Sequence, residues 1–261
     1  MGVVGVSQSD TARNRALRTV GVVAALAAEA RALGRARPHR AERASFGNLA
    51  FLSDGSMVAV SGIGAPAAAR AARALVDAGV AALMTFGLAG GLDPKLAAGA
   101  IVLATEVVSR ENAHRYPTAA IWRERLAKRL ESERSVVRGV LLTSDAAVES
   151  PTAKQAAWRA TGAVAVDMES VAVAAIAAEH QLPFISVRVV IDTAHDAVPA
   201  AVARASSTGQ VQVGRLLGGL IAAPGELLDL VRLAKRYRTA MKVLRLVARS
   251  GSLAPSEADG A

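Results

Sequence analysis

Short apolar runs separated by polar or alanine-rich stretches dominate the pattern along the chain. Each run has the length of a strand and ends at glycine, proline or polar residues, which predicts strands that are buried on both faces. The runs are Thr19 to Leu26, Ala81 to Phe86, Ile101 to Val108, Val137 to Thr143, Ala163 to Val166 and Phe184 to Ile191. Helices predicted between them give a single α/β domain with a mixed, mostly parallel central sheet flanked by helices.

Local signals place the shorter elements. Two further strand-like runs meet at Asp54-Gly55, a pair typical of a tight hairpin. The second run ends at Ser61, and Gly62-Ile63-Gly64 then opens a helix that extends to about Ala78. We also predict a short helix through Leu33, a charged helix around 121–130 and a helix that begins near Met168.

The ends of the chain differ in pattern from the middle. Residues 1–18 are polar and aperiodic and predict a flexible N-terminal extension, whereas 19–222 carry the domain. A helical pattern from about Ser206 is broken at Pro224-Gly225 and continues as a basic amphipathic helix over 223–250, before a tail at 251–261.

Composition narrows the chemistry. The chain has no cysteine, which excludes disulfides, thiolate catalysis and cysteine-based zinc sites. Its four histidines show no paired helical spacing, which argues against a structural metal. No apolar run reaches the roughly 18 residues of a membrane span, and the N-terminus lacks the pattern of a signal peptide. We therefore expect a cytoplasmic protein.

The charge is strongly basic and unevenly distributed. The formal net charge is +9, and the segment from Glu226 to Arg249 holds seven basic and two acidic residues. Such a patch can serve nucleic acid, anionic lipid or solubility. With 3% aromatic residues and no helix-turn-helix, zinc or RNA-stacking motif, a non-catalytic nucleic-acid-binding protein is the weaker alternative, and we expect no nucleic-acid partner.

Gly62-Ile63-Gly64 lies between a strand and a helix, as in dinucleotide-binding proteins. Ala67 replaces the third glycine of that fingerprint, and the strand Ala81 to Phe86 ends without the acidic residue that would hold a ribose. The segment is therefore better interpreted as a tight glycine turn than as the site of a nicotinamide-dependent dehydrogenase.

Three segments could carry chemistry at the carboxyl ends of strands. Gly87-Leu88-Ala89-Gly90-Gly91 reads as a turn whose backbone can approach a ligand. Val166-Asp167-Met168-Glu169-Ser170 places two carboxylates and a methionine at a strand-to-helix junction, and Asp192 follows the last strand. Spacing alone leaves structural interpretations open: Asp167 as a helix cap, Glu169 as a first-turn residue and Asp192 as a solvent-facing turn residue.

Taken together and in this order, the segments resemble the nucleoside phosphorylase and nucleosidase superfamily from about Thr19 to Leu220. The resemblance implies cleavage of the N-glycosidic bond of a purine nucleoside. In that family Met168 would pack on the ribose, Glu169 would accept its hydroxyl hydrogens, and Asp192 would protonate the departing base. Among the substrate-binding residues we also expect Arg188, Gly90, Gly91, Gly64 and Glu29. No cofactor is expected apart from phosphate as a candidate co-substrate, and we expect a homo-oligomer.

Departures from the family pattern bear on the nucleophile. The glutamate by which nucleosidases activate water aligns with Ala28, with Glu29 adjacent, and Arg31 lies near the place of a phosphorylase arginine. We therefore predict attack by phosphate, with Arg31 as a candidate ligand. Ala147 stands where an aromatic residue commonly stacks on the base, which argues against ordinary nucleosides.

The chain resembles most closely the hopanoid-associated phosphorylases, which remove adenine from adenosylhopane. The resemblance rests on the run Gly87 to Pro94, the junction Ala165 to Ser170 and the basic C-terminal helix. It implies adenosylhopane as the substrate, and a 5'-methylthioadenosine/S-adenosylhomocysteine nucleosidase that uses water is the alternative.

The C-terminal helix could place the enzyme at the inner face of the membrane as a peripheral protein. Its apolar stripe consists of Leu227, Leu230, Val231, Ala234, Tyr237, Met241, Leu244 and Ala248. Its basic residues are Arg232, Lys235, Arg236, Arg238, Lys242, Arg245 and Arg249. We expect the stripe to rest on the membrane surface, with packing on the protein itself or on a second subunit as the alternative.

Overall fold

The computed structural model describes residues 19–38, 49–111, 114–198, 227–250 and 253. The predicted N-terminal extension, the helical pattern from Ser206 to the break at Pro224-Gly225, and all of the tail except Leu253 lie outside the described residues. The described strands form one sheet. They are β1 (Val20–Ala24), β2 (Arg37–Pro38), β3 (Leu49–Phe51), β4 (Met57–Val60), β5 (Ala82–Gly91), β6 (Ile101–Ser109), β7 (Arg115–Pro117), β8 (Val136–Thr143), β9 (Ala165–Asp167) and β10 (Phe184–Asp192).

The strand order is β10-β6-β8-β9-β5-β1-β4-β3-β2, with β7 beside β6. A further pairing of β10 with β5 closes five of these strands into a ring. The longer ladders are parallel, and each antiparallel ladder spans only two or three residue pairs. The predicted mixed, mostly parallel sheet is therefore confirmed, and so is the hairpin at Asp54-Gly55, which joins β3 to β4.

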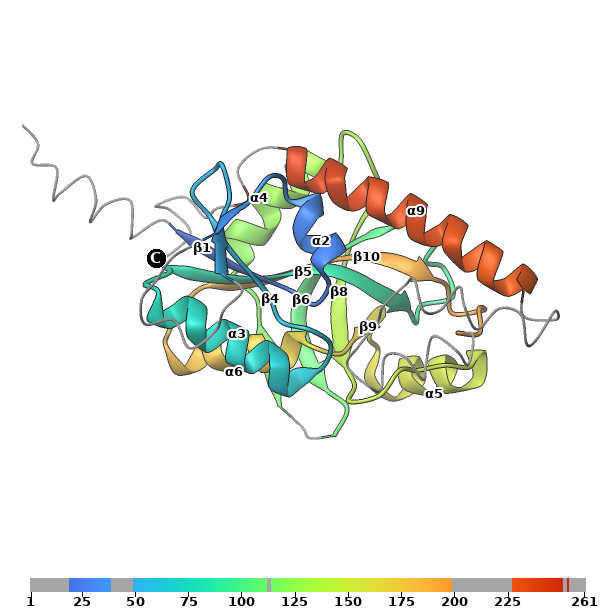
Figure 1. Cartoon of the computed structure of the whole chain (residues 1–261). Coiled ribbons are helices and arrows are strands. Elements are labelled where there is room, and N and C mark those ends of the chain that lie inside the picture. The colour runs from blue at the N-terminus through green and yellow to red at the C-terminus, as the bar shows by residue number, and fades with distance from the viewer. Residues whose placement is uncertain (1–18, 39–48, 112–113, 199–226, 251–252, 254–261) are drawn as a thin grey trace, which may run out of the picture.

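Helices cover both faces of the sheet, as Figure 1 shows. They are α2 (Ala27–Ala32), α3 (Ala65–Asp77), α4 (Ala120–Leu130), α5 (Pro151–Thr161), α6 (Ser170–Glu179) and α9 (Leu227–Arg249). Helices α3 and α6 pack together on one side, whereas α2, α4 and α9 lie on the other. Strand residues alternate between the two cores: Val22 packs on the side of α9 and Val23 on the side of α3. This two-sided burial explains why the strands read as continuous apolar runs.

The segment Gly87 to Gly91, predicted as a turn, is instead the second half of β5. It continues as a strand because β10 pairs with it as far as Gly90, and β9 pairs with Gly90 and Gly91 from the other side. The glycines thus lie between two strands that carry polar side chains.

Helix α9 uses its apolar face inside the protein. The described side chains that it buries are Ala240, Met241, Val243, Leu244 and Val247. The helix packs against β10 and α2, so Met241 and Leu244 of the predicted membrane stripe belong to the protein core. Our expectation that this part of the stripe rests on a membrane is wrong, because the same residues complete the core on this face of the sheet. No helix among the described residues is long and apolar enough to span a bilayer.

Substitution of Leu244 by alanine tests this packing. The side chain is fully buried, so its loss should lower the free energy of unfolding by about 2–5 kcal/mol. Chemical denaturation measures the loss, and the exposed Lys242→Ala on the same helix, expected within about 0.5 kcal/mol of wild type, is the control. Equal stability of the two variants would contradict docking of α9 on the core.

Candidate active site

The candidate site lies where β5, β9 and β10 come together. Gly90 of β5 pairs with Val166 of β9 on one side and with Asp192 of β10 on the other. The two acidic segments singled out in the sequence therefore flank the same glycine, although they are far apart along the chain. This end of β10 is also irregular, because its register with β5 shifts between Val190 and Asp192.

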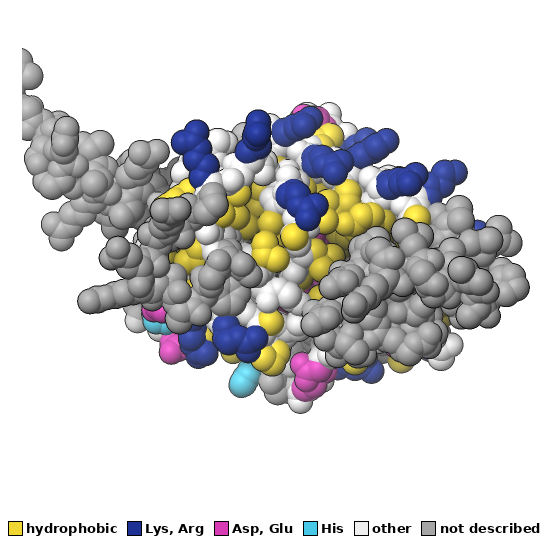
Figure 2. Space-filling view, viewed as in Figure 1, with side chains coloured by type: hydrophobic (Ala, Val, Ile, Leu, Met, Phe, Trp, Pro, Cys, Tyr) yellow, Lys and Arg dark blue, Asp and Glu magenta, His cyan; other side chains and the backbone are white. Residues whose placement is uncertain are grey.

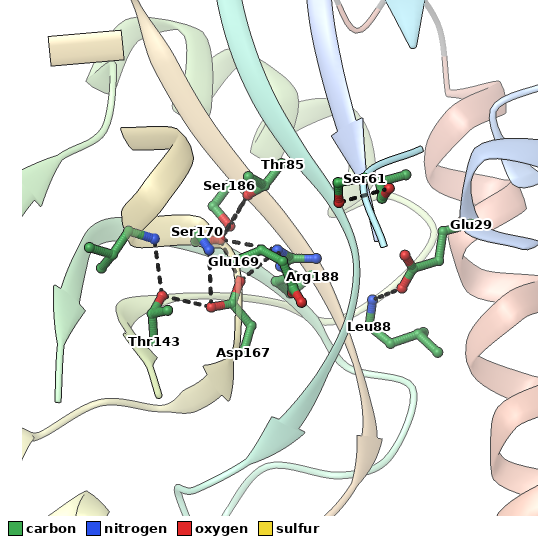
Figure 3. A network of polar contacts seen from close by, with 12 residues as sticks. Glu29, Ser61, Thr85, Leu88, Thr143, Asp167, Glu169, Ser170, Ser186 and Arg188 are labelled. Carbon is green, nitrogen blue, oxygen red and sulfur yellow. Dashed lines mark hydrogen bonds and ion pairs between the residues drawn. The ribbon is translucent and has the colours of Figure 1, made fainter. Parts of the chain in front are cut away.

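Arg188 is the centre of a buried ion network (Figure 3). Its side chain comes from β10 and is 1% exposed. The Nη2 atom lies 2.6 Å from Oδ2 of Asp167 and 3.9 Å from Oε2 of Glu169, and it donates to Oγ of Ser170 at 3.1 Å. Burial alone would lower the pKa of Arg188, but the attraction of Asp167, Glu169 and Glu29 outweighs it and raises the pKa. The guanidinium is therefore held as a cation by surrounding carboxylates.

Asp167 anchors this guanidinium. Its carboxylate accepts hydrogen bonds from Oγ1 of Thr143 at 2.7 Å and Oγ of Ser170 at 2.5 Å, besides its ion pair with Arg188. The amide of Ser170 also donates to it at 3.3 Å, which is the helix-start contact expected of this residue. Asp167 thus does more than cap α6, and it was not among the site residues predicted from the sequence.

Glu169 faces Arg188 from the junction before α6 and is 6% exposed. Its Oε1 accepts the backbone N–H of Gly64 at 2.9 Å. Gly64 precedes α3 with a φ of 97°, a conformation that favours glycine. Burial, followed by the repulsion of Asp167, raises the pKa of Glu169 to about 7, even though Arg188 and the Gly64 amide oppose the rise. The predicted binding residue Gly64 therefore contacts the predicted ribose ligand Glu169.

Glu29 joins the network from α2 on the opposite side of Arg188 (Figure 3). Its carboxylate is buried and accepts the amides of Leu26 and Leu88, each at 2.9 Å. Burial raises the pKa of Glu29, and the attraction of Arg188 opposes that rise. A Cβ atom at position 87 would lie 2.5 Å from a Glu29 oxygen and 2.7 Å from Nη1 of Arg188, so Gly87 makes the approach possible.

Glu29, and not its neighbour Ala28, belongs to the buried network around Arg188. Ala28 is partly buried and packs against the apolar core, whereas the next residue directs its carboxylate into the site. The short helix α2 decides which of these two neighbouring side chains turns towards Arg188.

The structure does not bring Arg31 to this network. It lies two residues after Glu29 on α2, which places it about 200° around the helix, and its side chain is exposed. Arg31 therefore does not belong to the buried network around Arg188.

Three further predicted residues, Met168, Gly90 and Gly91, lie next to the acidic residues of the candidate site. Met168 is half-buried and lies between Asp167 and Glu169 in the sequence. A Cβ at Gly90 would lie 3.5 Å from Oδ2 of Asp192, and one at Gly91 would lie 3.0 Å from the backbone oxygen of Asp192. Glycine at these positions leaves space beside the acid.

Asp192 pairs with a residue that the sequence reasoning missed. Lys154 of α5 is fully buried and forms an ion pair with Oδ2 of Asp192. Burial raises the pKa of Asp192, while the Lys154 ammonium opposes the rise. Asp192 is thus a buried acid rather than a solvent-facing turn residue. Among the residues that the structure describes, no cluster of three histidine or acidic side chains could hold a metal ion.

Comparison with known proteins identifies the family. A family model described as the phosphorylase superfamily matches residues 17–221. The chain belongs to the phosphorylase superfamily. This result confirms the predicted superfamily and agrees with the α/β domain and mixed sheet described above.

Solved structures of the superfamily share the fold at low sequence identity. The 5'-methylthioadenosine/S-adenosyl homocysteine nucleosidase of Helicobacter pylori is 20% identical with a TM-score of 0.62, and the match covers 88% of this chain and 97% of that one. The futalosine hydrolase of the same organism is 18% identical with a TM-score of 0.63, and the match covers 88% of this chain and 97% of that one. A putative 5'-methylthioadenosine/S-adenosylhomocysteine nucleosidase from Francisella philomiragia is 23% identical with a TM-score of 0.62. This match covers 77% of this chain and 99% of that one.

The candidate site holds more carboxyl groups than cations. Three carboxylates, from Glu29, Asp167 and Glu169, surround the single guanidinium of Arg188. Three carboxyl groups thus face one guanidinium in a buried environment, where charges interact more strongly than in water. An excess of carboxyl groups over cations favours a positively charged group over an anion.

The raised pKa of Glu169 predicts a pH-dependent gain in stability for Glu169→Gln. The folded protein binds this proton more tightly than the unfolded chain, so the contribution of the protonated form is complete below the unfolded value of 4.5 and is lost as the pH rises through about 7. Glutamine is neutral throughout. The unfolding free energy of the variant should therefore rise relative to wild type, on the order of 3 kcal/mol between about pH 5 and pH 8.

Denaturant titrations across this pH range measure the difference. Glu179→Gln, at an exposed position on α6, is the matched control and should show no such trend. Parallel pH curves for wild type and Glu169→Gln would mean that Glu169 titrates as an ordinary carboxyl.

Proposed function

We propose that this member of the phosphorylase superfamily hydrolyses the N-glycosidic bond of an adenine nucleoside. The observation that carries the proposal is the anionic cluster around Arg188, with Glu29 on one side of the guanidinium and Glu169 on the other. Cleavage of a glycosidic bond passes through a sugar with oxocarbenium character, which a buried negative cluster stabilises. The similarity to nucleosidases that act on 5'-methylthioadenosine and S-adenosylhomocysteine supports adenine as the base.

Each carboxyl has a distinct role in the proposed reaction. Glu169 accepts hydrogen bonds from the ribose hydroxyls, and Met168 packs on the sugar. Glu29 takes a proton from the water that attacks the anomeric carbon, and the bond from that carbon to the base nitrogen breaks. Its electron pair goes to the purine, which receives a proton from Asp192. Burial raises the pKa of both Glu29 and Asp192, which makes Glu29 a stronger base and lets Asp192 hold its proton more tightly.

Water rather than phosphate is the nucleophile in this proposal. The two buried cations in the described part of the site are each committed to carboxylates, Arg188 to Asp167 and Lys154 to Asp192. Arg31, the ligand that we predicted for phosphate, is exposed and does not belong to the buried network. An incoming phosphate would meet the carboxyls of Glu29 and Glu169, and the one cation beside them, Arg188, is already paired with Asp167.

Substitution of the two proton-transfer residues tests the proposed reaction. Glu29→Gln and Asp192→Asn keep the size of the side chain and remove its ability to exchange a proton. Each should reduce the rate of adenine release by about a hundredfold or more, with the fold intact. Glu179→Gln is again the control. Near-wild-type turnover by Asp192→Asn, measured on the best of adenosylhopane, 5'-methylthioadenosine, S-adenosylhomocysteine and inosine, would contradict the assignment of the acid.

We further propose that the physiological nucleoside is lipid-linked, with adenosylhopane as the substrate and hopanoid biosynthesis as the setting. The glycine run Gly87 to Pro94 and the junction Ala165 to Ser170 carry this resemblance. A 5'-methylthioadenosine/S-adenosylhomocysteine nucleosidase is the second candidate, favoured by the similar solved structures. The same substrate panel separates the two, because the preferred substrate has the higher kcat/KM.

The outer face of α9 supports a peripheral location at a membrane. Five basic side chains are exposed on the side opposite to the buried residues: Lys235, Arg238, Lys242, Arg245 and Arg249. Figure 2 shows lysine and arginine gathered over α9, with apolar side chains beside them on the same face. Each cation near an anionic leaflet contributes about 1 kcal/mol, so the set would give reversible binding. The contact is thus electrostatic and does not need the apolar stripe that the core uses.

Removal of these five charges tests the membrane contact. A variant with glutamine at all five positions should lose co-sedimentation with vesicles that contain anionic lipid, and added salt should weaken binding of the wild type. Arg70→Gln with Arg73→Gln, which removes two exposed charges from α3 on the other side of the sheet, is the control. Failure of the wild type to bind such vesicles at low salt would contradict the peripheral location and leave the glycosidic reaction untouched.

A further inference from the structure

Lys154 is a fully buried lysine with an unusual set of partners. Its ammonium donates to Oδ2 of Asp192, to the backbone oxygen of Thr193 at 2.8 Å and to that of Asp196 at 2.9 Å. An ammonium has three protons, and all three are used here. A buried lysine is costly unless it is paired in this way, so the position is specific for a cation with three donors.

The segment after β10 is closed into a compact loop around this ammonium. Oδ2 of Asp196 accepts the amide of Thr193 at 2.9 Å and its hydroxyl at 2.7 Å. The same oxygen forms an ion pair with Nη1 of Arg236 on α9 at 2.7 Å. The loop is therefore fixed from two sides, by α5 through Lys154 and by α9 through Arg236.

Asp192 lies at the point where the regular strand gives way to this loop. The register shift between Val190 and Asp192 means that the ladder with β5 does not by itself fix the direction of the carboxyl group. Lys154 donates hydrogen bonds to one carboxyl oxygen of Asp192 and to two loop carbonyls. Gly90 leaves room beside both carboxyl oxygens. The orientation of the acid thus depends on a residue from a helix that contributes no other group to the site described above.

We propose that Lys154 is a positioning residue, which holds the Asp192 carboxyl and its loop in the orientation needed for proton transfer to the departing base. The inference rests on the proposed function, because it assumes that Asp192 is the acid. A side chain that only filled space could be replaced by an apolar one of similar volume. A positioning cation could not, because it also sets the charge next to the acid.

The charge of Lys154 gives the proposal a signature in the pH dependence. The charged groups around Asp192 are Lys154 from α5, Asp196 from its own loop and Arg236 from α9. Burial raises the pKa of Asp192, and the Lys154 ammonium lowers it. Loss of the ammonium should therefore raise the pKa further, so that the acid keeps its proton to higher pH while losing its orientation.

Kinetics of Lys154→Met on adenine release test the proposal. We expect kcat to fall on the order of tenfold to a hundredfold with a smaller change in KM, and the alkaline limb of the kcat profile to move to higher pH. Lys154→Arg keeps the charge and should leave the alkaline limb near its wild-type position. The exposed Lys128→Met on α4 is the matched control and should behave as wild type.

Two further measurements make the outcome unambiguous. In an Asp192→Asn background, Lys154→Met should cause little additional loss, because both changes remove the same step. Lys154→Gln, which keeps a donor and removes the charge, replaces Lys154→Met if the latter does not fold by circular dichroism. A folded charge-removing variant with wild-type kcat and an unmoved alkaline limb would overturn the proposal. An active Asp192→Asn enzyme would instead overturn the proposed function itself.

Discussion

The candidate site depends on one constraint, the burial of a guanidinium in the interior of an apolar protein. Arg188 is tolerated there because carboxylates approach it from different elements: Asp167 and Glu169 from the junction of β9 with α6, and Glu29 from α2. Gly87 on β5 leaves the space through which Arg188 and Glu29 approach each other. The ring of strands brings these elements together, since β5 pairs with both β9 and β10. The same fold that satisfies the arginine therefore assembles the acidic groups.

The electrostatic outcome of this arrangement explains the proposed chemistry. One cation faces three carboxyl groups, and burial, followed by the repulsion of Asp167, raises the pKa of Glu169 to about 7. The proposed reaction needs one carboxyl group as a base and another as an acid, and these two groups lie in different surroundings. Glu29 and Glu169 share Arg188, whereas Asp192 lies beside Lys154 and the loop that follows β10. The base and the acid of the proposed hydrolysis thus have separate cationic partners.

The sequence predicted those parts of the fold that follow from local pattern. Strands such as β6 and β10 were found within one or two residues, because burial on both faces makes their sequences continuously apolar. The junction around Glu169 and the residue Asp192 were predicted as site segments because they follow the glycine run in the order typical of the superfamily. Helix α5 was not predicted, although Ser150 caps it, Pro151 begins it and Gly162 ends it with a left-handed conformation.

Features that depend on tertiary contacts could not be predicted in the same way. Glu29 and Ala28 differ by one position, and only the docking of α2 against β5 shows which of them reaches Arg188. Lys154 is a lone lysine in sequence, and its partners lie 38 or more residues away. The periodicity of α9 was correct, but periodicity does not reveal whether a protein core or a membrane covers an apolar face.

The identity of the sugar product in excess phosphate tests the central claim most directly, that the anionic cluster around Arg188 directs water rather than phosphate to the sugar. Phosphorus NMR of a completed reaction, together with the rate of adenine release with and without phosphate, gives the answer. Our account predicts a free sugar product, no sugar phosphate signal and a rate that does not depend on phosphate. Formation of a sugar 1-phosphate in proportion to adenine would contradict it.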